Sequence, residues 1–235
     1  MLRIDDFLWY IFMNNNANDN SLNAYTTTIN GATLTTNELG ISNRAYDFDG
    51  VNDSITMGAS AYDALIDAVN AGVVSLHINM INNKANNKND GVLNAYDNSG
   101  DFNKHYGVAE FTTSTNFTIL SCGGGGVSVN NIYTSVAPTL STWKKMIYET
   151  TYATTKNTGR VLKDGVALGL ARPETNQLVI KSVSSSRSIW IGWRQDSPAN
   201  RSFKGKMNNV FAIKKVINAT EQSYINKFGN MKRIA

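Results

Sequence analysis

The chain has 235 residues, of which 42% are hydrophobic and 17% are charged, while asparagine occurs 31 times. This composition is unlike that of a salt-bridged helical bundle, and one large β-sandwich accommodates this length as a single unit, so we expect one domain over residues 1–235. The net charge of +4 comes from 22 basic and 18 acidic residues spread along the chain. A nucleic-acid-binding protein would concentrate basic residues in a stripe, so no nucleic acid partner is expected.

The chain begins with apolar residues that are interrupted by three charges. Arg3, Asp5 and Asp6 lie within residues 1–13, so neither the apolar core of a signal peptide nor a membrane span can be drawn through this segment. We expect no export signal and no membrane insertion.

Short alternating or apolar segments, bounded by Asn, Gly, Asp and Ser, recur along the chain as the strands of a two-sheet fold do. The pattern predicts strands at residues 7–12, 45–48, 54–57, 73–81, 92–96, 105–111, 117–121, 144–152, 159–163, 178–182, 189–193 and 207–213. Tight reversals are predicted at Asn52-Asp53 and at Asp164-Gly165, where both residues of the second pair tolerate the positive φ of a type I′ hairpin. The expected fold class is all-β, a two-sheet antiparallel β-sandwich.

Two short peripheral helices are also predicted. Ser60 followed by Asp63, with Gly72 after the apolar positions, is typical of a capped helix with a glycine stop. Asn218 followed by Glu221 gives the same signal near the C-terminus. Each helix is too short to be stable alone and must pack on a sheet.

Four stretches of the sequence carry a family resemblance. They are Leu8-Trp9-Tyr10-Ile11-Phe12 with the Asn/Asp/Ser loop at residues 16–21, Ala45-Tyr46-Asp47-Phe48-Asp49-Gly50-Val51-Asn52-Asp53-Ser54-Ile55, Trp143 with residues 161–168, and Ile191-Gly192 with residues 203–210 and the closing helix. In this order they resemble the laminin-G-like domains of the concanavalin-A-like lectin/glucanase superfamily, in the variant common in bacterial and phage proteins. The resemblance implies a concanavalin-A-like jelly roll. Asn208 and Asn209 depart from it, since the family usually has two aspartates there.

Some members of this superfamily hydrolyse glycans, and that chemistry needs two carboxylates about 5 Å apart, placed by a Glu-x-Asp-x-Glu alternation on one strand. The five glutamates of this chain are at least 25 residues apart, and none has an aspartate two residues later. The four consecutive glycines at 123–126 lack the Gly-Lys-Ser/Thr of a phosphate loop and are predicted to form a turn. We therefore expect no enzyme, no catalytic residue and, because Cys122 is the single cysteine and His77 and His105 are far apart, no thiolate zinc site.

Calcium is the one cofactor that the resemblance suggests, because relatives hold this cation in end loops with Asp, Asn and backbone oxygens. Candidate ligands are Asn18, Asp19, Asp47, Asp49 and Asp53. The alternative, which we favour, is that these side chains cap turns through hydrogen bonds to the backbone.

Sugar binding requires exposed aromatic rings beside amide and carboxylate groups. Trp190 and Trp193 lie near two isoleucines of one predicted strand, so one face of this strand carries large aromatic side chains. That face is either a binding surface or the core. Tyr96 and Tyr106, close to polar loops, are further candidates.

These observations favour a non-catalytic binding or structural module. Without an export signal, the preferred hypothesis is a phage virion protein on the particle surface or tail, which contacts other virion structural proteins and holds host surface glycans. The alternatives are a secreted, extracellular carbohydrate-binding module and a divergent glycan hydrolase.

Overall fold

The computed structural model describes residues 2–13, 15–83, 89–97, 105–111, 116–121, 130–134, 139–152, 156–172, 174–176, 186–193 and 202–228. The predicted strand at 178–182 and the glycine-rich turn at 122–126 lie outside these residues. So does the side chain of His105.

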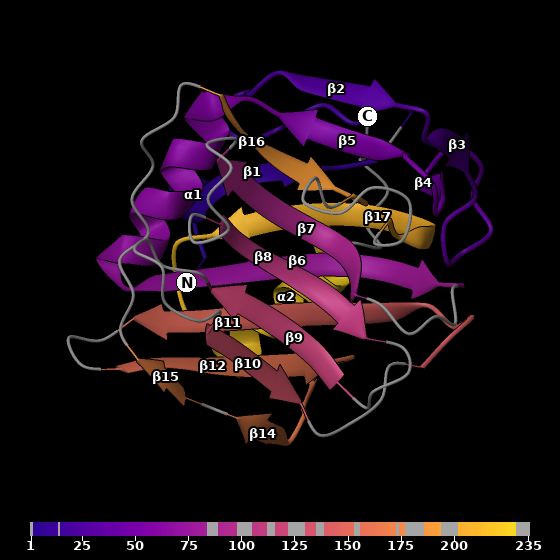
Figure 1. The fold of residues 1–235 in the computed structure, drawn as a ribbon. Coiled ribbons are helices and arrows are strands. Elements are labelled where there is room, and N and C mark those ends of the chain that lie inside the picture. Colours follow the sequence, from indigo (N-terminus) through magenta and orange to yellow (C-terminus); the bar gives the residue numbers. More distant parts are fainter. Residues whose placement is uncertain are drawn as a thin grey trace.

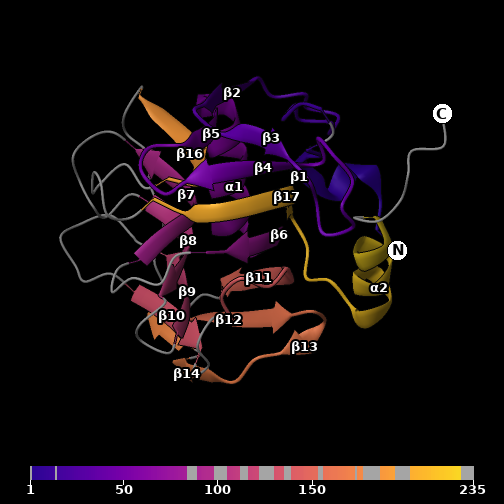
Figure 2. The ribbon, with the colours of Figure 1, turned by 90° about the vertical axis from the view of Figure 1, so that its right-hand side faces the viewer.

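The described strands form two antiparallel sheets that face each other (Figures 1 and 2). The nine-stranded sheet has the order β13 (Val166–Ala167), β12 (Lys156–Lys163), β11 (Lys144–Tyr152), β6 (Val73–Asn82), β17 (Lys204–Ile213), β4 (Ala45–Asp49) and β3 (Thr33–Thr35), with β1 (Phe7–Ile11) beside β17 and β15 (Glu174–Asn176) beside β12. The eight-stranded sheet has the order β14 (Leu170–Arg172), β10 (Asn130–Thr134), β9 (Asn116–Ser121), β8 (His105–Phe111), β7 (Asn89–Asp97), β16 (Arg187–Ile191), β5 (Ser54–Met57) and β2 (Thr27–Asn30). The predicted all-β sandwich with two short helices is confirmed.

The two predicted reversals have different roles. Asp164 and Gly165 both have positive φ, 51° and 89°, and join β12 to β13 with Lys163 opposite Val166, as a type I′ hairpin requires. The turn containing Asn52 and Asp53 also forms, but β4 and β5 on either side of it belong to different sheets. This turn therefore carries the chain across the sandwich.

Aromatic side chains fill the space between the sheets. Trp9, Phe48, Tyr106 and Tyr148 are among the largest fully buried side chains. The Tyr106 hydroxyl, from the eight-stranded sheet, lies 2.8 Å from Thr150 Oγ1 of the nine-stranded sheet, so the one polar atom of this buried ring has a partner. Burial raises the pKa of Tyr106 above its ordinary value.

Helix α1 (Ala59–Ala71) closes one end of the sandwich (Figure 1). It contacts β7 and β16 of one sheet and β1, β6 and β11 of the other, and buries Tyr62, Leu65 and Val69. Its cap differs from the prediction: the helix begins after Gly58 rather than at Ser60, and Gly58 offers no capping side chain. The predicted glycine stop is confirmed, since Gly72 has φ 126° and its N–H donates to the Val69 carbonyl.

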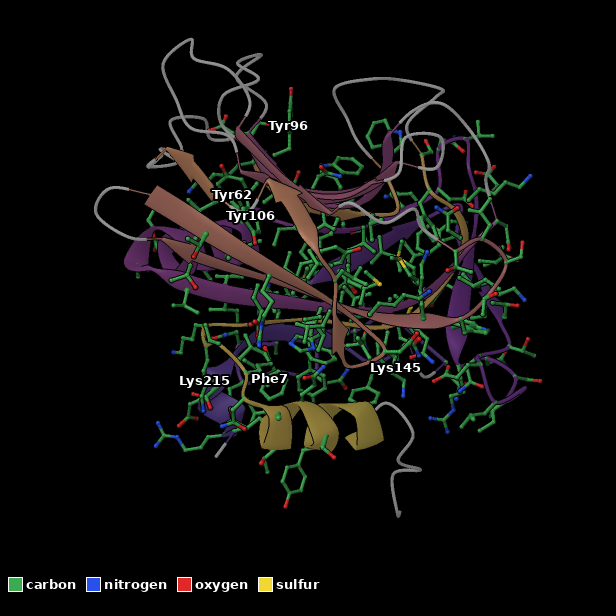
Figure 3. The ribbon with its side chains drawn as sticks, turned by 90° about the horizontal axis from the view of Figure 1, so that it is seen from below. Phe7, Tyr62, Tyr96, Tyr106, Lys145 and Lys215 are labelled. Carbon is green, nitrogen blue, oxygen red and sulfur yellow. The ribbon has the colours of Figure 1, made fainter. Side chains whose placement is uncertain are left out.

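Helix α2 (Ala219–Phe228) lies outside the nine-stranded sheet, on the side away from the other sheet (Figures 2 and 3). The predicted cap is confirmed: the Glu221 N–H donates to Asn218 Oδ1 at 2.9 Å, and the Asn218 N–H donates to Glu221 Oε2 at 3.3 Å. Lys215 donates to the same carboxylate and holds the pKa of Glu221 down at about 2. None of the described helices is long and apolar enough to cross a membrane.

The segment that leads into α2 is fastened to the nine-stranded sheet by polar side chains. Ser75 Oγ donates to the Lys215 carbonyl at 2.7 Å, the Ile217 N–H donates to Glu149 Oε1 at 3.1 Å, and Arg160 donates to both Glu149 and the Ile217 carbonyl. Glu149 is 3% exposed. A buried carboxylate therefore organises the path of residues 214–218.

His77, on β6, is buried on the same outer face and stacks on Phe211 with ring centroids 4.6 Å apart. Burial lowers the pKa of His77 from 6.5 to about 3. Because the unfolded chain binds this proton more readily, the free energy of unfolding should fall as the pH decreases from about 6.5 to about 3, by about 1.4 kcal/mol per pH unit from this residue.

Urea unfolding of the native chain and of His77→Phe, compared from pH 7 to pH 4, measures this contribution. As the pH falls, the free energy of unfolding of the native chain should decrease more than that of the variant. This difference should grow at lower pH. A constant difference across this range would mean that His77 is not held neutral by the fold.

Candidate ligand-binding face

Strand β16 presents Trp190 on the outer face of the eight-stranded sheet. Ile189 and Ile191 are fully buried between the sheets. Because successive side chains of a strand point to opposite faces, Trp190 points away from the core, where it is half-buried. Of the two readings that the sequence allowed, the structure therefore supports an outward-facing tryptophan.

Trp193 lies after the end of β16, and a turn of the chain brings its ring next to Trp190. The strand ends at Ile191, and Gly192 turns the chain with φ 86°; a Cβ at this position would lie 2.3 Å from the Phe48 ring. The Phe203 N–H donates to the Gly192 carbonyl and fixes the turn. The Trp193 ring consequently lies edge-on to Trp190, with centroids 4.7 Å apart and an interplanar angle of 62°.

A row of neutral residues crosses five strands at the level of Trp190. On β16, Trp190 lies opposite Thr56 of β5 on one side and Asn94 of β7 on the other, and the row continues to Thr28 of β2 and Gly107 of β8. Neighbouring strands are about 4.8 Å apart, so four intervals give the row a length of about 19 Å. We call Thr28, Thr56, Trp190, Asn94 and Gly107, together with Trp193, the tryptophan face.

Asn94 joins the two tryptophans to the strands beside them. Its Nδ2 donates to the Trp193 carbonyl at 3.3 Å. Gly107 lies opposite, and a Cβ there would come within 2.4 Å of Asn94 Oδ1. A residue without a side chain is thus required for the amide to keep this position.

The two candidate tyrosines lie on opposite faces of the eight-stranded sheet. Tyr96 is half-buried beside Ser188, two residues along β7 from Asn94, and Figure 3 shows it on the far side of the sheet from the core. Tyr106 lies between the sheets (Figure 3) and is 0% exposed. As a ligand-contacting residue Tyr106 is a wrong prediction, because the alternation of β8 directs it inward together with Val108.

The candidate calcium ligands do not come together as one site. Both carboxylate oxygens of Asp19 accept hydrogen bonds from protein groups, namely the N–H groups of Tyr10, Ser21 and Tyr25 and the Ser21 hydroxyl. Asn18 is exposed, and its carbonyl accepts from Asn20 Nδ2. These residues organise a loop, which is the turn-capping role favoured from the sequence.

The other three aspartates lie around the β4–β5 turn. Asp53 Oδ2 accepts from the Asp49 N–H at 2.8 Å, and Asp49 Oδ1 accepts from the Val51 N–H at 2.7 Å. Burial raises the pKa of Asp53, with smaller contributions from the charges of Asp49 and Asp47, while the hydrogen bond from Asp49 opposes this. Within the described part of the chain, no three His, Cys, Asp or Glu side chains are grouped so that they could hold a metal ion.

The glutamates whose side chains are described are each bound by protein donors. Glu38 accepts from Asn79 Nδ2 at 2.8 Å and from Asn208 Nδ2 at 2.6 Å. Asn208 is one of the residues that depart from the family pattern, and here its amide complements a carboxylate from a loop. Glu149 accepts hydrogen bonds from Arg160 and the Ile217 N–H, and Glu221 accepts from Lys215.

Sequence reasoning missed Asn94, Thr56 and Gly107. Asn94 carried a usable signal, because it lies between Leu93 and Ala95, two apolar residues that both point into the core. A single amide in such a position must face outward.

No protein-family model matches the chain, and no curated protein matches it. Among solved structures, it is similar to the receptor-binding domain of botulinum neurotoxin C/D mosaic serotype, with a TM-score of 0.69 and 9% identity over 96% of this chain and 52% of that one. The binding domain of botulinum neurotoxin DC in complex with SialylT gives 0.64 and 10% identity over 97% and 52%. Trypanosoma rangeli sialidase in complex with sialic acid gives 0.63 and 13% identity over 97% and 33%.

The chain therefore spans about half of the toxin domains and one third of the sialidase. At these identities the likeness concerns the fold. It supports the two-sheet β-sandwich that the strands of the chain form.

Proposed function

We propose that this chain is a non-catalytic carbohydrate-binding module of the laminin-G-like type, and that the tryptophan face is its binding surface. The observation that carries the proposal is the pair of half-buried indole rings on an outer sheet face, in contact with each other and flanked by an amide and hydroxyls. Aromatic faces stack on the apolar side of a sugar ring, while neutral polar groups bind its hydroxyls. The glycan ligands of the toxin and sialidase structures support a binding role for this fold.

A catalytic role has less support. A retaining hydrolase needs two carboxylates facing one bond, whereas the described glutamates are held by Arg160, Lys215 and two asparagine amides. The tryptophan face, as far as it is described, carries no carboxylate.

Glycan-array screening followed by calorimetric titration of the best ligand tests the proposal. Trp190→Ala should weaken binding at least about 10-fold, because a tryptophan at the centre of a binding surface contributes about 2 kcal/mol or more. Trp143→Ala is the matched control, since Trp143 is a half-buried tryptophan that precedes β11 in the other sheet.

The control should bind like the native chain, and circular dichroism should show that both variants are folded. Equal affinity of the Trp190 variant and the native chain would refute the proposed surface. Absence of binding to every glycan on the array would refute the function.

The placement on a phage particle, with other virion proteins as partners, remains a prediction. A glycan-binding face is useful on a virion surface or tail and equally in a secreted module. Antibody labelling of purified particles would distinguish these two locations.

A further inference from the structure

Two polar atoms at the centre of the tryptophan face have no hydrogen-bond partner among the described residues. They are the indole Nε1 of Trp190, a donor, and Oδ1 of Asn94, an acceptor; both are buried. Trp190 and Asn94 are direct cross-strand partners on β16 and β7, and side chains in this relation are neighbours on one face of a sheet.

Leaving buried polar atoms unpaired is costly. An unpaired group loses its hydrogen bonds to water without a replacement, so native proteins pair nearly all of their buried donors and acceptors with protein groups, water or a ligand. The donor and the acceptor belong to cross-strand partners on one face of the sheet. A hydroxyl is the group that satisfies both at once, because its oxygen accepts from an N–H while its hydrogen is donated to a carbonyl oxygen.

The position of the Asn94 amide is fixed from both sides. Its Nδ2 is bonded to the Trp193 carbonyl, and Gly107 leaves the space that its Oδ1 occupies. The same hydrogen bond ties the amide to the residue whose ring packs edge-on against Trp190. Both unpaired atoms are buried, so a ligand can reach them only if side chains at this face change rotamer on binding, a common event at interfaces.

The charge of the surrounding face is also informative. Thr28, Thr56 and Gly107 are neutral, as are Ser188 and Tyr96 in the next row; that row continues to His105, whose side chain lies outside the described residues. The nearest described cation along β16, Arg187, is turned to helix α1, where its Nε and Nη2 each lie 2.6 Å from a carboxylate oxygen of Asp63. In the described part of this face no cation is placed to pair with the carboxylate of an acidic sugar.

From these observations we infer that the tryptophan face binds a neutral sugar, one of whose hydroxyls lies between Trp190 Nε1 and Asn94 Oδ1, so that Asn94 determines specificity. This inference rests on the proposed carbohydrate-binding function. Beyond that function, it specifies an uncharged rather than a sialylated ligand and names Asn94 as the residue that accepts from the hydroxyl.

The test uses pairs of oligosaccharides that differ by a terminal sialic acid, titrated into the native chain and into Asn94→Leu. The leucine has a similar size and lacks the amide. The native chain should bind the neutral member of a pair at least about 10-fold more tightly than the sialylated member, and Asn94→Leu should lose at least about 10-fold in affinity for the neutral member. Thr56→Val, which removes a hydroxyl on the other side of Trp190, is the matched control and should lose less.

A second readout needs only the native fold. In nitrogen–proton correlation spectra, the indole N–H signal of Trp190, assigned by its loss in Trp190→Phe, should shift during titration with the neutral oligosaccharide. If Asn94→Leu fails to fold, the Trp190 signal of the native chain still tests the inference. A signal that does not shift during the titration overturns it.

The two proposals fail in different ways. Tighter binding of the sialylated member that still depends on Trp190, or unchanged affinity in a folded Asn94→Leu variant, overturns the neutral-sugar inference and leaves the binding function standing. No binding of any oligosaccharide, or binding that is indifferent to Trp190→Ala, overturns both.

Discussion

Gly205→Ala is expected to lower the free energy of unfolding by about 3 kcal/mol or more. Gly205 is buried in β17 with φ 144°, a backbone conformation that residues with side chains rarely adopt. A Cβ at this position would lie 2.0 Å from the Ile81 carbonyl oxygen of the neighbouring strand. Because the obstacle is backbone, the two strands must move apart, and urea unfolding of the variant should show a much lower midpoint.

Gly40→Ala separates the cost of the positive φ from the cost of the clash with the neighbouring strand. Gly40 also has a positive φ, 73°, but a Cβ there meets no atom within 4 Å. This control should lose only the cost of the backbone conformation, about 1–2 kcal/mol. If both variants lost the same amount, the close approach of β6 and β17 at Gly205 would contribute nothing.

Glu149→Ala should have the second-largest effect, a loss of about 2–3 kcal/mol. The substitution leaves the Ile217 N–H without its acceptor and removes the ion pair with Arg160, while the Ser75 hydroxyl keeps the Lys215 carbonyl as its acceptor. The Arg160 side chain is 45% exposed, so water can solvate its charge once Glu149 is gone, which keeps the loss below that for a fully buried pair.

The same variant should loosen the attachment of α2. Limited trypsin digestion, followed by mass spectrometry, should show faster cleavage after Lys214 and Lys215 than in the native chain, while cleavage in the strands follows global unfolding. Tyr224→Ala is a suitable control, because this side chain is 55% exposed on α2. Native-like cleavage in Glu149→Ala would mean that other contacts hold the segment.

The fold class followed from the sequence because strands such as β1, β6, β11 and β17 contain alternating or apolar runs. The edge strands β2 and β3 were missed, since they are short and each has two threonines and a single large apolar residue. The role of the Asn52-Asp53 turn was also out of reach, because turn residues specify a reversal but not whether the strands on either side pair with each other.

The candidate site was predictable in part. Alternation showed that Trp190 and its isoleucine neighbours point to different faces, but which face is buried depends on the other sheet and is not a local property. The pairing of Asn94 with Trp190 depends on the register between β7 and β16, which are about ninety residues apart along the chain. The Asp19 hydrogen bonds, by contrast, are local, and the turn-capping role could be inferred from residue type.

Strand β17 occupies the interior of the nine-stranded sheet and hydrogen-bonds to β6 on one side and to both β1 and β4 on the other. During synthesis, β1 leaves the ribosome almost two hundred residues before this partner, a delay of about 10–40 s at ordinary elongation rates. Throughout that time β1 lacks the strand with which it pairs. The nine-stranded sheet therefore cannot be completed until residues 204–213 have left the ribosome, and a nascent chain stalled before residue 204 should remain a client of chaperones.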